Sequence, residues 1–289
     1  MKTPQIIVGV DGSPGAAAAT QWAAAEAVRT GSELVVIHVY DWRIIGAKAP
    51  IGGAYAEDVR ARAGALVEAA VADAKASAPQ VQVRGEAVLG GVAPTLVSAS
   101  EQASLVVLGC RGRGGFASLL LGSVSQQVAT HASSPVVIVR GRSGEIEGPV
   151  VVGADGSGSA HHAIGAAFEA AARRGTNLVA VRAYTPAQPS WGPYVAPYVE
   201  DREAREAAER EALEADVKPW AEKYPDITVE TVVVDRPAAD VLIGISSTAQ
   251  LIVVGTRGHG GFAGVLVGSV GLHLLHHAEC PVFVDRAAN

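Results

Sequence analysis

The sequence predicts a duplicated α/β protein: two tandem Rossmann-like domains, each an open five-stranded parallel sheet with helices on both faces. An internal repeat predicts the duplication, because IIVGVDGS at Ile6–Ser13 returns as VVVGADGS at Val150–Ser157. The stretch GCRGRGGFASLLLGSV at Gly109–Val124 returns, in the same order, as GTRGHGGFAGVLVGSV at Gly255–Val270. A repeat as long as a whole domain indicates a doubled domain rather than a solenoid. Within each copy, short apolar runs alternate with helical stretches, as in parallel sheets covered by helices on both faces.

Length and composition fit two domains of ordinary size. The chain has 289 residues, 49% of them hydrophobic, which is enough apolar material for two cores. We place the first domain at residues 1–144 and the second at residues 145–289. The polar, glycine-containing stretch GRSGEIEGP at Gly141–Pro149 is the natural linker between them.

Charge and cysteine content exclude several classes of protein. The net charge of −6 argues against a protein that grips nucleic acid through a broad basic surface. The first apolar run is too short for a signal peptide or a membrane span. Cys110 and Cys280 are the two cysteines and form no C-x-x-C motif, which fits a reducing compartment. We therefore expect a cytoplasmic protein without nucleic-acid or membrane partners.

The first copy gives the predicted order of elements. Each continuous run rich in Val and Ile predicts a buried strand, and each Ala-rich or helically spaced stretch predicts a helix. The predicted strands are Gln5–Val10, Leu34–Val39, Val81–Val88, Leu105–Gly109 and Val136–Val139. The predicted helices are Pro14–Thr30, Ala56–Ser77, Ala93–Gln102 and Ser123–His131. Strands and helices therefore alternate, and the second copy repeats the order.

The residues that follow the strands indicate where a ligand binds. In an open parallel sheet, ligands occupy the crevice beyond the carboxyl ends of the strands, where the strand order reverses. Asp11 and Asp155 follow the first strand of each copy, and a glycine-rich loop follows the fourth strand. If these two strands are neighbours, Asp11 faces the loop that begins at Gly109.

The loop has the chemistry of a phosphate cradle. Its glycines allow positive φ angles and remove side chains, so that consecutive N–H groups can turn toward an anion. Ser123 can cap the following helix, with Gln126 completing a capping box, or it can donate to a phosphate. Asp11 is unsuited to phosphate, but its carboxylate can accept hydrogen bonds from ribose hydroxyls or hold a metal. Together these features predict a nucleotide site.

Two familiar nucleotide motifs are missing from the sequence. It contains no G-x-x-x-x-G-K-[ST] P-loop, and no G-x-G-x-x-G follows the first strand. It contains instead the pattern G-x2-G-x9-G-[ST], once at Gly109, Gly112, Gly122 and Ser123, and again at Gly255, Gly258, Gly268 and Ser269.

With its V-G-x-D-G-S opening, this loop and the closing SPVVIV, the chain resembles the universal stress protein family in its tandem two-domain form. The resemblance spans nearly the whole chain. It implies the strand order 3-2-1-4-5 in each domain and an ATP site in each, with or without Mg²⁺, used in stress adaptation rather than in a defined metabolic reaction. One subset of the family lacks the glycine motif and does not bind ATP; this chain keeps the motif twice, which favours two occupied sites.

The resemblance also implies residue roles. Asp11 and Asp155 would meet the ribose or a metal, Gly9 and Gly153 would lie beside the nucleotide, and backbone groups of Val39 and Ala183 would meet adenine. The phosphates would be wrapped by Gly109, Arg111, Gly112, Arg113, Gly114, Gly115, Gly122, Ser123 and Val124, and in the second domain by Gly255, Arg257, Gly258, His259, Gly260, Gly261, Gly268, Ser269 and Val270.

Simpler interpretations of these residues stay open. The glycines could make only a tight turn, Asp11 and Asp155 could cap the next helix, and Arg111 and Arg257 could be solvated cations. Arg113 is replaced by His259 in the second copy, which suggests unequal affinities.

Two further segments suggest binding roles of their own. His273, His277 and Cys280 could suggest zinc, but the first copy has Gln127, His131 and Ser134 there, so we expect no metal site. The Pro-rich stretch Thr185–Glu200 could be a lid, a docking surface or a cover of the domain's own core.

Three functions fit the sequence. The first is an ATP-binding regulatory or stress protein that acts through a protein partner. The second is a slow ATPase or nucleotidyl transferase; no Ser-His-Asp set, P-loop lysine or paired carboxylate accompanies both loops, so we expect slow turnover or none. The third is an interaction scaffold with non-functional loops. Relatives in the family commonly pair through the last strand, which implies an internal pseudo-dimer of the two halves and allows a homodimer of whole chains.

Overall fold

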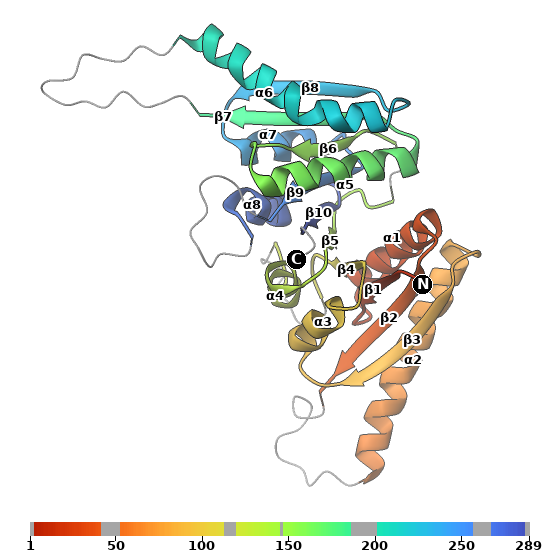
Figure 1. Ribbon diagram of the computed structural model, residues 1–289. Coiled ribbons are helices and arrows are strands. Elements are labelled where there is room, and N and C mark those ends of the chain that lie inside the picture. Colours follow the sequence, from red (N-terminus) through yellow and green to blue (C-terminus); the bar gives the residue numbers. More distant parts are fainter. Residues whose placement is uncertain are drawn as a thin grey trace, which may run out of the picture.

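The computed structural model describes residues 3–41, 53–112, 120–144, 147–185, 201–256 and 267–286. Strands and helices alternate along both halves (Figure 1). The strands of the first half are β1 (Gln5–Gly9), β2 (Glu33–Tyr40), β3 (Val83–Leu89), β4 (Leu105–Gly109) and β5 (Val136–Val139). Its helices are α1 (Pro14–Thr30), α2 (Gly53–Ser77), α3 (Val92–Ser100) and α4 (Ser123–His131).

The second half repeats this series. Its strands are β6 (Val150–Gly153), β7 (Leu178–Tyr184), β8 (Val229–Asp235), β9 (Leu251–Gly255) and β10 (Val282–Asp285). Its helices are α5 (Gly158–Arg174), α6 (Arg202–Lys223), α7 (Ala238–Ile245) and α8 (Ser269–His277). The α/β class and the alternation predicted from the sequence are therefore confirmed.

All the strands in the described part of the chain belong to one ten-stranded sheet, in the order β3-β2-β1-β4-β5-β10-β9-β6-β7-β8. Each half is parallel within itself and has the predicted order 3-2-1-4-5. The halves meet where β5 and β10 pair antiparallel, with Val137 opposite Phe283. The predicted pairing of the two halves through their last strands is therefore present, and it relates them by an approximate two-fold rotation.

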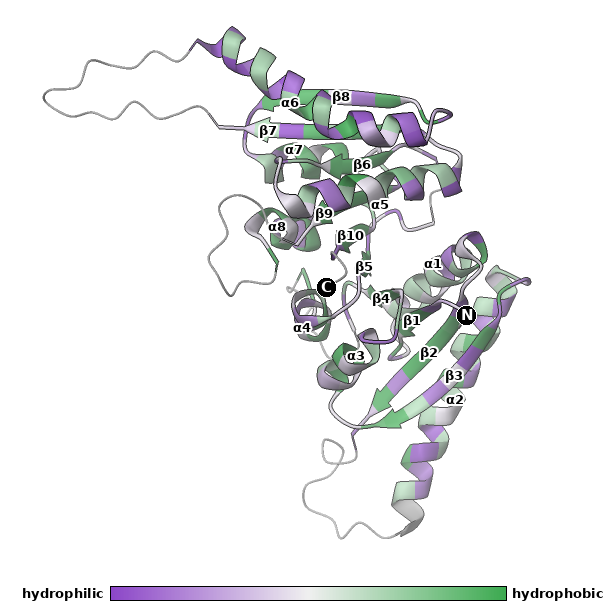
Figure 2. Ribbon diagram, in the orientation of Figure 1, coloured by the Kyte–Doolittle hydropathy of each residue, from purple (hydrophilic) through white to green (hydrophobic). Residues whose placement is uncertain are grey.

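Two hydrophobic layers cover the sheet, and each runs across both halves. One contains buried residues of α1, α2, α5 and α6 against one face, and the other contains those of α3, α4, α7 and α8. In Figure 2 the central strands are mostly green, the colour of hydrophobic residues, whereas green and purple residues alternate along α2 and α6. This pattern follows from position, because central parallel strands are covered on both faces while the outer helices face water on one side.

The first helix of each half owes its limits to local chemistry. Ser13 and Ser157 are the N-caps of α1 and α5, and their hydroxyl oxygens accept the N–H groups of Ala16 and Ala160. Both helices end at a glycine with φ of 63°, Gly31 or Gly175, a left-handed conformation that glycine adopts without strain.

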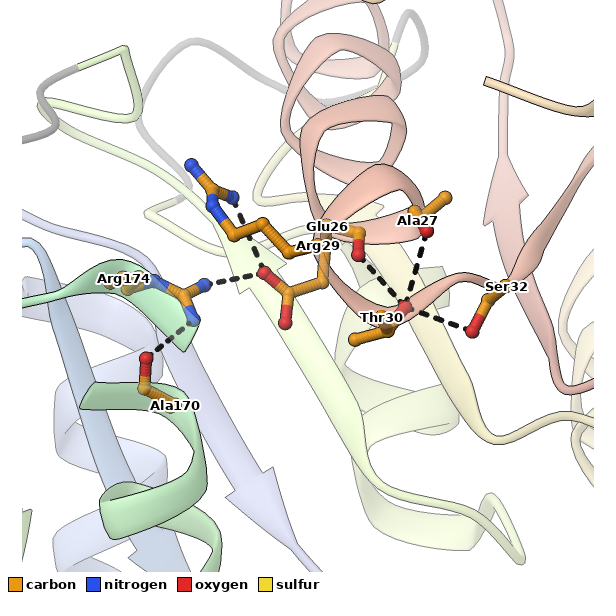
Figure 3. Close-up of polar contacts among 7 residues, drawn as sticks. All are labelled: Glu26, Ala27, Arg29, Thr30, Ser32, Ala170 and Arg174. Atoms are coloured by element: carbon orange, nitrogen blue, oxygen red, sulfur yellow. Dashed lines mark hydrogen bonds and ion pairs between the residues drawn. The ribbon is translucent and has the colours of Figure 1, made fainter. Parts of the chain in front are cut away.

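An ion pair joins the two halves beside the sheet. Arg174 of α5 donates to the Glu26 carboxylate of α1 at 2.6 Å (Figure 3). The guanidinium also lies 5.7 Å from the centre of the Trp22 ring. Arg29 approaches the same carboxylate at 3.4 Å. The pair adds a charged contact between halves that the strand pairing alone does not provide.

The described part of the predicted linker packs against the second half. Gly141 and Gly148 have positive φ angles of 54° and 103°, and a side chain on either would collide with a backbone carbonyl, of Glu279 or Thr248. Arg142 donates to the Ala249 carbonyl at 3.2 Å. The described part of this stretch, which contains the predicted domain boundary, is therefore packed against the second half and is not a free tether.

Several element boundaries differ from those predicted, by one to three residues; α3, for example, ends at Ser100 rather than Gln102. Strand β3 begins at Val83 rather than Val81, and α2 begins at Gly53 rather than Ala56. Most residues of β3 are exposed because it is an edge strand, so its pattern is weak. Among the described helices, none is long and apolar enough to cross a membrane.

Candidate functional site

Asp11 and the glycine loop face one another at the carboxyl end of the sheet. Strands β1 and β4 are neighbours, with Val8 opposite Val107, so the segments that follow them meet. A Cβ on Gly112 would collide with the Asp11 Oδ2 atom, and the Ser13 hydroxyl donates to the Arg111 carbonyl at 3.3 Å. The juxtaposition expected at the switch point of the sheet is therefore present in the first domain.

Asp11 shapes its own loop but does not cap the helix. Its Oδ1 atom accepts the Ser13 N–H at 3.0 Å, and Gly12 between them has φ of 77°. The second domain repeats the turn, because Asp155 Oδ1 accepts the Ser157 N–H at 3.0 Å across Gly156, whose φ is 79°. The simpler interpretation of these aspartates as helix caps is wrong, since Ser13 and Ser157 are the caps.

The first glycine of each loop lies against the start of a helix. A Cβ on Gly109 would come 2.5 Å from the Gly15 carbonyl oxygen in α1, and one on Gly255 would come 2.8 Å from Ser159 in α5. Glycine at these positions lets the loop, the D-G-S turn and the helix N-terminus approach one another. A helix N-terminus that is this close to a loop rich in N–H groups favours anionic ligands.

The far end of each loop returns to its beginning. The Gly122 N–H donates to the Cys110 carbonyl at 2.8 Å, and the Gly268 N–H donates to the Thr256 carbonyl at 2.7 Å. These bonds close the loop at the start of α4 or α8.

The profile of the Universal stress protein family matches residues 3–140 and again 148–286. The chain belongs to the universal stress protein family. Universal stress protein Rv1996 of Mycobacterium tuberculosis is 37% identical, and the alignment covers 97% of this chain and 94% of that relative. Universal stress protein Rv2623 of the same organism is 36% identical, with 97% and 96% covered. A crystal structure of a universal stress protein from Archaeoglobus fulgidus has the same fold, with a TM-score of 0.70 at 20% identity and coverage of 98% and 96%.

The capping role predicted for Ser123 in this universal stress protein is wrong. Gly122 is the N-cap of α4 and makes no side-chain cap, and Ser123 is the first helical residue with an exposed side chain. Ser125 instead holds the helix to the loop, because its hydroxyl donates to the Gly109 carbonyl at 2.7 Å. Because no capping box forms, no N-cap side chain accepts the first N–H groups of α4. The exposed Ser123 side chain is accessible to a ligand. Ser269 of α8 is likewise exposed after its N-cap, Gly268.

The remaining predicted site residues lie around this centre. Arg111 is exposed beside Gly112, and Val124 and Val270 are half-buried in the first turns of α4 and α8. Val39 and Ala183 lie near the ends of β2 and β7, paired with Val88 and Val234. A Cβ on Gly9 would meet Leu108 and Leu96, and one on Gly153 would meet Leu242, so both glycines make room for core side chains.

Part of each predicted loop lies outside the described residues. These positions are Arg113, Gly114, Gly115, Arg257, Gly258, His259, Gly260 and Gly261, together with most of the Pro-rich stretch, residues 186–200. Their roles stay predictions.

Sequence reasoning missed two corresponding residues, one in each copy, that lie next to the aspartate turns. In the first domain, His38 Nδ1 lies 2.7 Å from the Val10 carbonyl. Arg182 takes the corresponding place in β7, with Glu209 at 2.6 Å and Asp216 at 3.3 Å, and it lies against Gly156. Comparing the two copies residue by residue would have revealed this difference between the sites.

The described residues contain no group of three or more His, Cys, Asp or Glu side chains that could hold a metal ion. His273 and His277 lie on one face of α8, with ring centres 6.4 Å apart. Burial raises the pKa of the Cys280 thiol to about 12, so it stays protonated and is a poor ligand at neutral pH.

Proposed function

We propose that this universal stress protein binds ATP, one molecule in each domain, and that the bound nucleotide regulates its interaction with a protein partner. The observation that carries the proposal is the approach of the Asp11 carboxylate to Gly112, which leaves no room for a side chain. A carboxylate suited to ribose hydroxyls thus lies next to exposed backbone suited to phosphate.

The described residues fit such a ligand. In the first domain, Asp11 would accept the ribose hydroxyls, while the backbone after Gly109 and the first turn of α4 would hold the phosphates. Arg111 and the exposed Ser123 would add a charge and a hydroxyl. Asp155, Gly255 and Ser269 would do the same in the second domain. Mg²⁺, if it accompanies ATP, would neutralise phosphate charge next to an aspartate.

Binding without rapid hydrolysis is the form of this proposal that the sequence favours. Neither copy supplies a P-loop lysine, and no Ser-His-Asp set or paired carboxylates accompany both loops. A steady-state ATPase assay separates this function from the slow enzyme. Repeated turnover of ATP at each site, even well below the roughly 10 per second of ordinary enzymes, would favour the slow enzyme instead.

The first experiment is to denature the purified protein and identify any released nucleotide by chromatography, with its ratio to chain. We expect about two adenine nucleotides per chain after incubation with ATP and magnesium. Asp11→Ala and Asp155→Ala variants should each lower the ratio by about one. A protein that releases none and binds none would overturn the proposal and favour the interaction scaffold.

The same preparation tests the assembly. A homodimer of whole chains and a cytoplasmic location remain predictions of the sequence, and light scattering with and without ATP measures the first. A protein partner whose binding changes with nucleotide would support the regulatory role.

A further inference from the structure

An arginine of the first domain reaches the end of a helix in the second. Arg140 follows β5 directly, and its Nη1 donates to the carbonyls of Leu274, at 3.4 Å, and Leu275. Both carbonyls belong to the last turn of α8. The Leu274 carbonyl also accepts the Ala278 N–H at 2.9 Å, but the Glu279 N–H, which would reach Leu275 in a longer helix, donates to the Ser246 hydroxyl instead. Arg140 therefore caps a helix that belongs to the other domain.

The second domain makes the reciprocal contact. Arg286 follows β10 directly, and its Nη2 donates to the Ala129 carbonyl in the last turn of α4. Ala129 and Leu275 are the seventh residues of α4 and α8, which both have nine residues. Figure 1 shows both helices beside the β5 and β10 pair at the centre of the molecule.

Both arginine side chains are half-buried. Burial lowers the pKa of Arg286, and burial, together with the charge of Arg111, lowers that of Arg140. Each remains a cation at neutral pH, because arginine titrates so far above it. The Nε atoms of both are buried without a hydrogen-bond partner among the described residues, so the carbonyl contacts are the main polar anchors shown there for these side chains. A cation at a helix C-terminus is favourable, and more so when partly buried.

The opposite ends of the two helices face the proposed sites. Helix α4 begins where the first glycine loop closes, and α8 begins where the second closes. A nine-residue helix is about 13 Å long and behaves as a short rod. Each rod thus has one end at the phosphate region of its own domain and the other end at an arginine from the partner domain.

Each arginine is also tied to the loop of its own domain. Arg140 follows Val139, whose carbonyl accepts the Cys110 N–H at the base of the first loop. Arg286 follows Asp285, which pairs in register with Gly255 at the start of the second loop. A change in one loop can therefore reach the helix that begins the other site.

From this arrangement we propose that Arg140 and Arg286 are positioning residues that couple the two nucleotide sites crosswise: Arg286 orients α4 for the first site, and Arg140 orients α8 for the second. The inference rests on the proposed function. It predicts that removing an arginine from one domain weakens binding in the other domain.

The test uses full-length proteins that keep one site each. Asp155→Ala leaves the first site and Asp11→Ala leaves the second, and ATP with magnesium is titrated by calorimetry. In the first-site protein, Arg286→Met should weaken ATP binding about fivefold, whereas Arg140→Met should change it much less. In the second-site protein the two effects should be exchanged. Arg286→Lys and Arg140→Lys, which keep the cation, should restore part of the affinity.

Arg142 provides the matched control. Arg142 is also an arginine near the junction of the two halves with a buried Nε, but it donates to the Ala249 carbonyl, which lies outside α4 and α8. Arg142→Met should therefore leave both affinities unchanged. Equal effects of the Arg140 and Arg286 variants on both sites, or a larger effect of each on its own domain, would overturn the crosswise assignment.

Hydrogen exchange separates failure of this inference from failure of the proposed function. Arg286→Met should speed exchange in α4 more than in α8, and Arg140→Met the reverse, without any nucleotide. If the one-site proteins bind no ATP, the proposed function fails, and exchange alone decides whether the arginines hold the helices. If they bind ATP and exchange is unchanged in both variants, the positioning role is wrong.

Discussion

Glu26 of the first domain and Arg174 of the second meet at 2.6 Å, and their side chains are only 8% and 4% exposed. The duplication does not explain this pair. Helices α1 and α5 have equal lengths, and at the corresponding positions Glu26 matches Ala170 while Arg174 matches Thr30. The ion pair therefore forms only between a first domain and a second domain. Two first domains would bury Glu26 without Arg174, and two second domains would bury Arg174 without Glu26, so pairing of identical domains is disfavoured.

Removing one member of this pair should be costly. Glu26→Ala leaves the Arg174 guanidinium buried without its carboxylate, and we expect the free energy of unfolding to fall by about 3 kcal/mol. The double variant Glu26→Ala, Arg174→Met should lose much less than the sum of the single changes, as measured by urea denaturation.

Arg29 is the control for this cycle. It approaches Glu26 at 3.4 Å, but its side chain is 27% exposed, so Arg29→Ala should lose less than about 1 kcal/mol. Additive losses in the Glu26 and Arg174 double variant would show that the two side chains do not act as a pair.

Gly112→Ala tests the contact on which the candidate site depends. The new Cβ would collide with Asp11 Oδ2, so the carboxylate or the loop must move. We expect ATP affinity at the first site to fall about tenfold or more, equivalent to about 1.4 kcal/mol. Calorimetry on the Asp155→Ala background isolates that site.

Gly64→Ala is the matched control for this change. Gly64 lies in α2, and a Cβ there has no atom within 4 Å. The substitution should leave affinity unchanged and raise the free energy of unfolding by about 0.5–1 kcal/mol, because alanine favours the helix. Unchanged binding in both glycine variants would place the ligand away from the Asp11 turn.

Ser13→Ala tests how far the helix cap supports the loop. Ser13 accepts the Ala16 N–H at 3.1 Å and donates to Arg111, so one hydroxyl serves both elements. The variant should lower the free energy of unfolding by about 1 kcal/mol and speed hydrogen exchange in α1. The exposed Ser98 of α3 is the control, and its replacement by alanine should have little effect.

Features set by local sequence patterns could be predicted, whereas contacts between residues far apart in the chain could not. The alternation of strands and helices and the place of Asp11 opposite the glycine loop follow from local patterns and from a repeat, which the sequence displays directly, whereas the strand order is what the family resemblance implies. The N-cap of α4 was predicted wrongly because Gly122 and Ser123 are adjacent and either could begin the helix. The Glu26–Arg174 pair and the reciprocal Arg140 and Arg286 contacts join residues far apart in the chain, and no local pattern indicates them. The start of the edge strand β3 lies two residues later than predicted, because a largely exposed strand lacks a continuous apolar run.

Asp285 makes stability depend on pH in an unusual direction. Burial raises the pKa of its carboxyl, opposed by His162 and by the backbone N–H of Arg286, and supported by Glu169. A carboxyl whose folded pKa is raised resists ionisation in the folded state, so it lowers stability as pH rises above the ordinary range near 4. Below that range both states are protonated, and the penalty disappears.

Asp285→Asn should therefore unfold at a higher temperature than the parent protein at pH 7. The difference should shrink as pH is lowered toward about 4, because the parent then regains the stability that ionisation removes. Thermal unfolding followed by circular dichroism at several pH values measures both trends, with the exposed Asp226→Asn as the control. Val139 occupies the corresponding place in the first domain, so Asp285→Val should raise the unfolding temperature in the same way. A difference between parent and Asp285→Asn that is constant across pH would mean that the carboxyl is not held away from water, and the raised pKa would then be wrong.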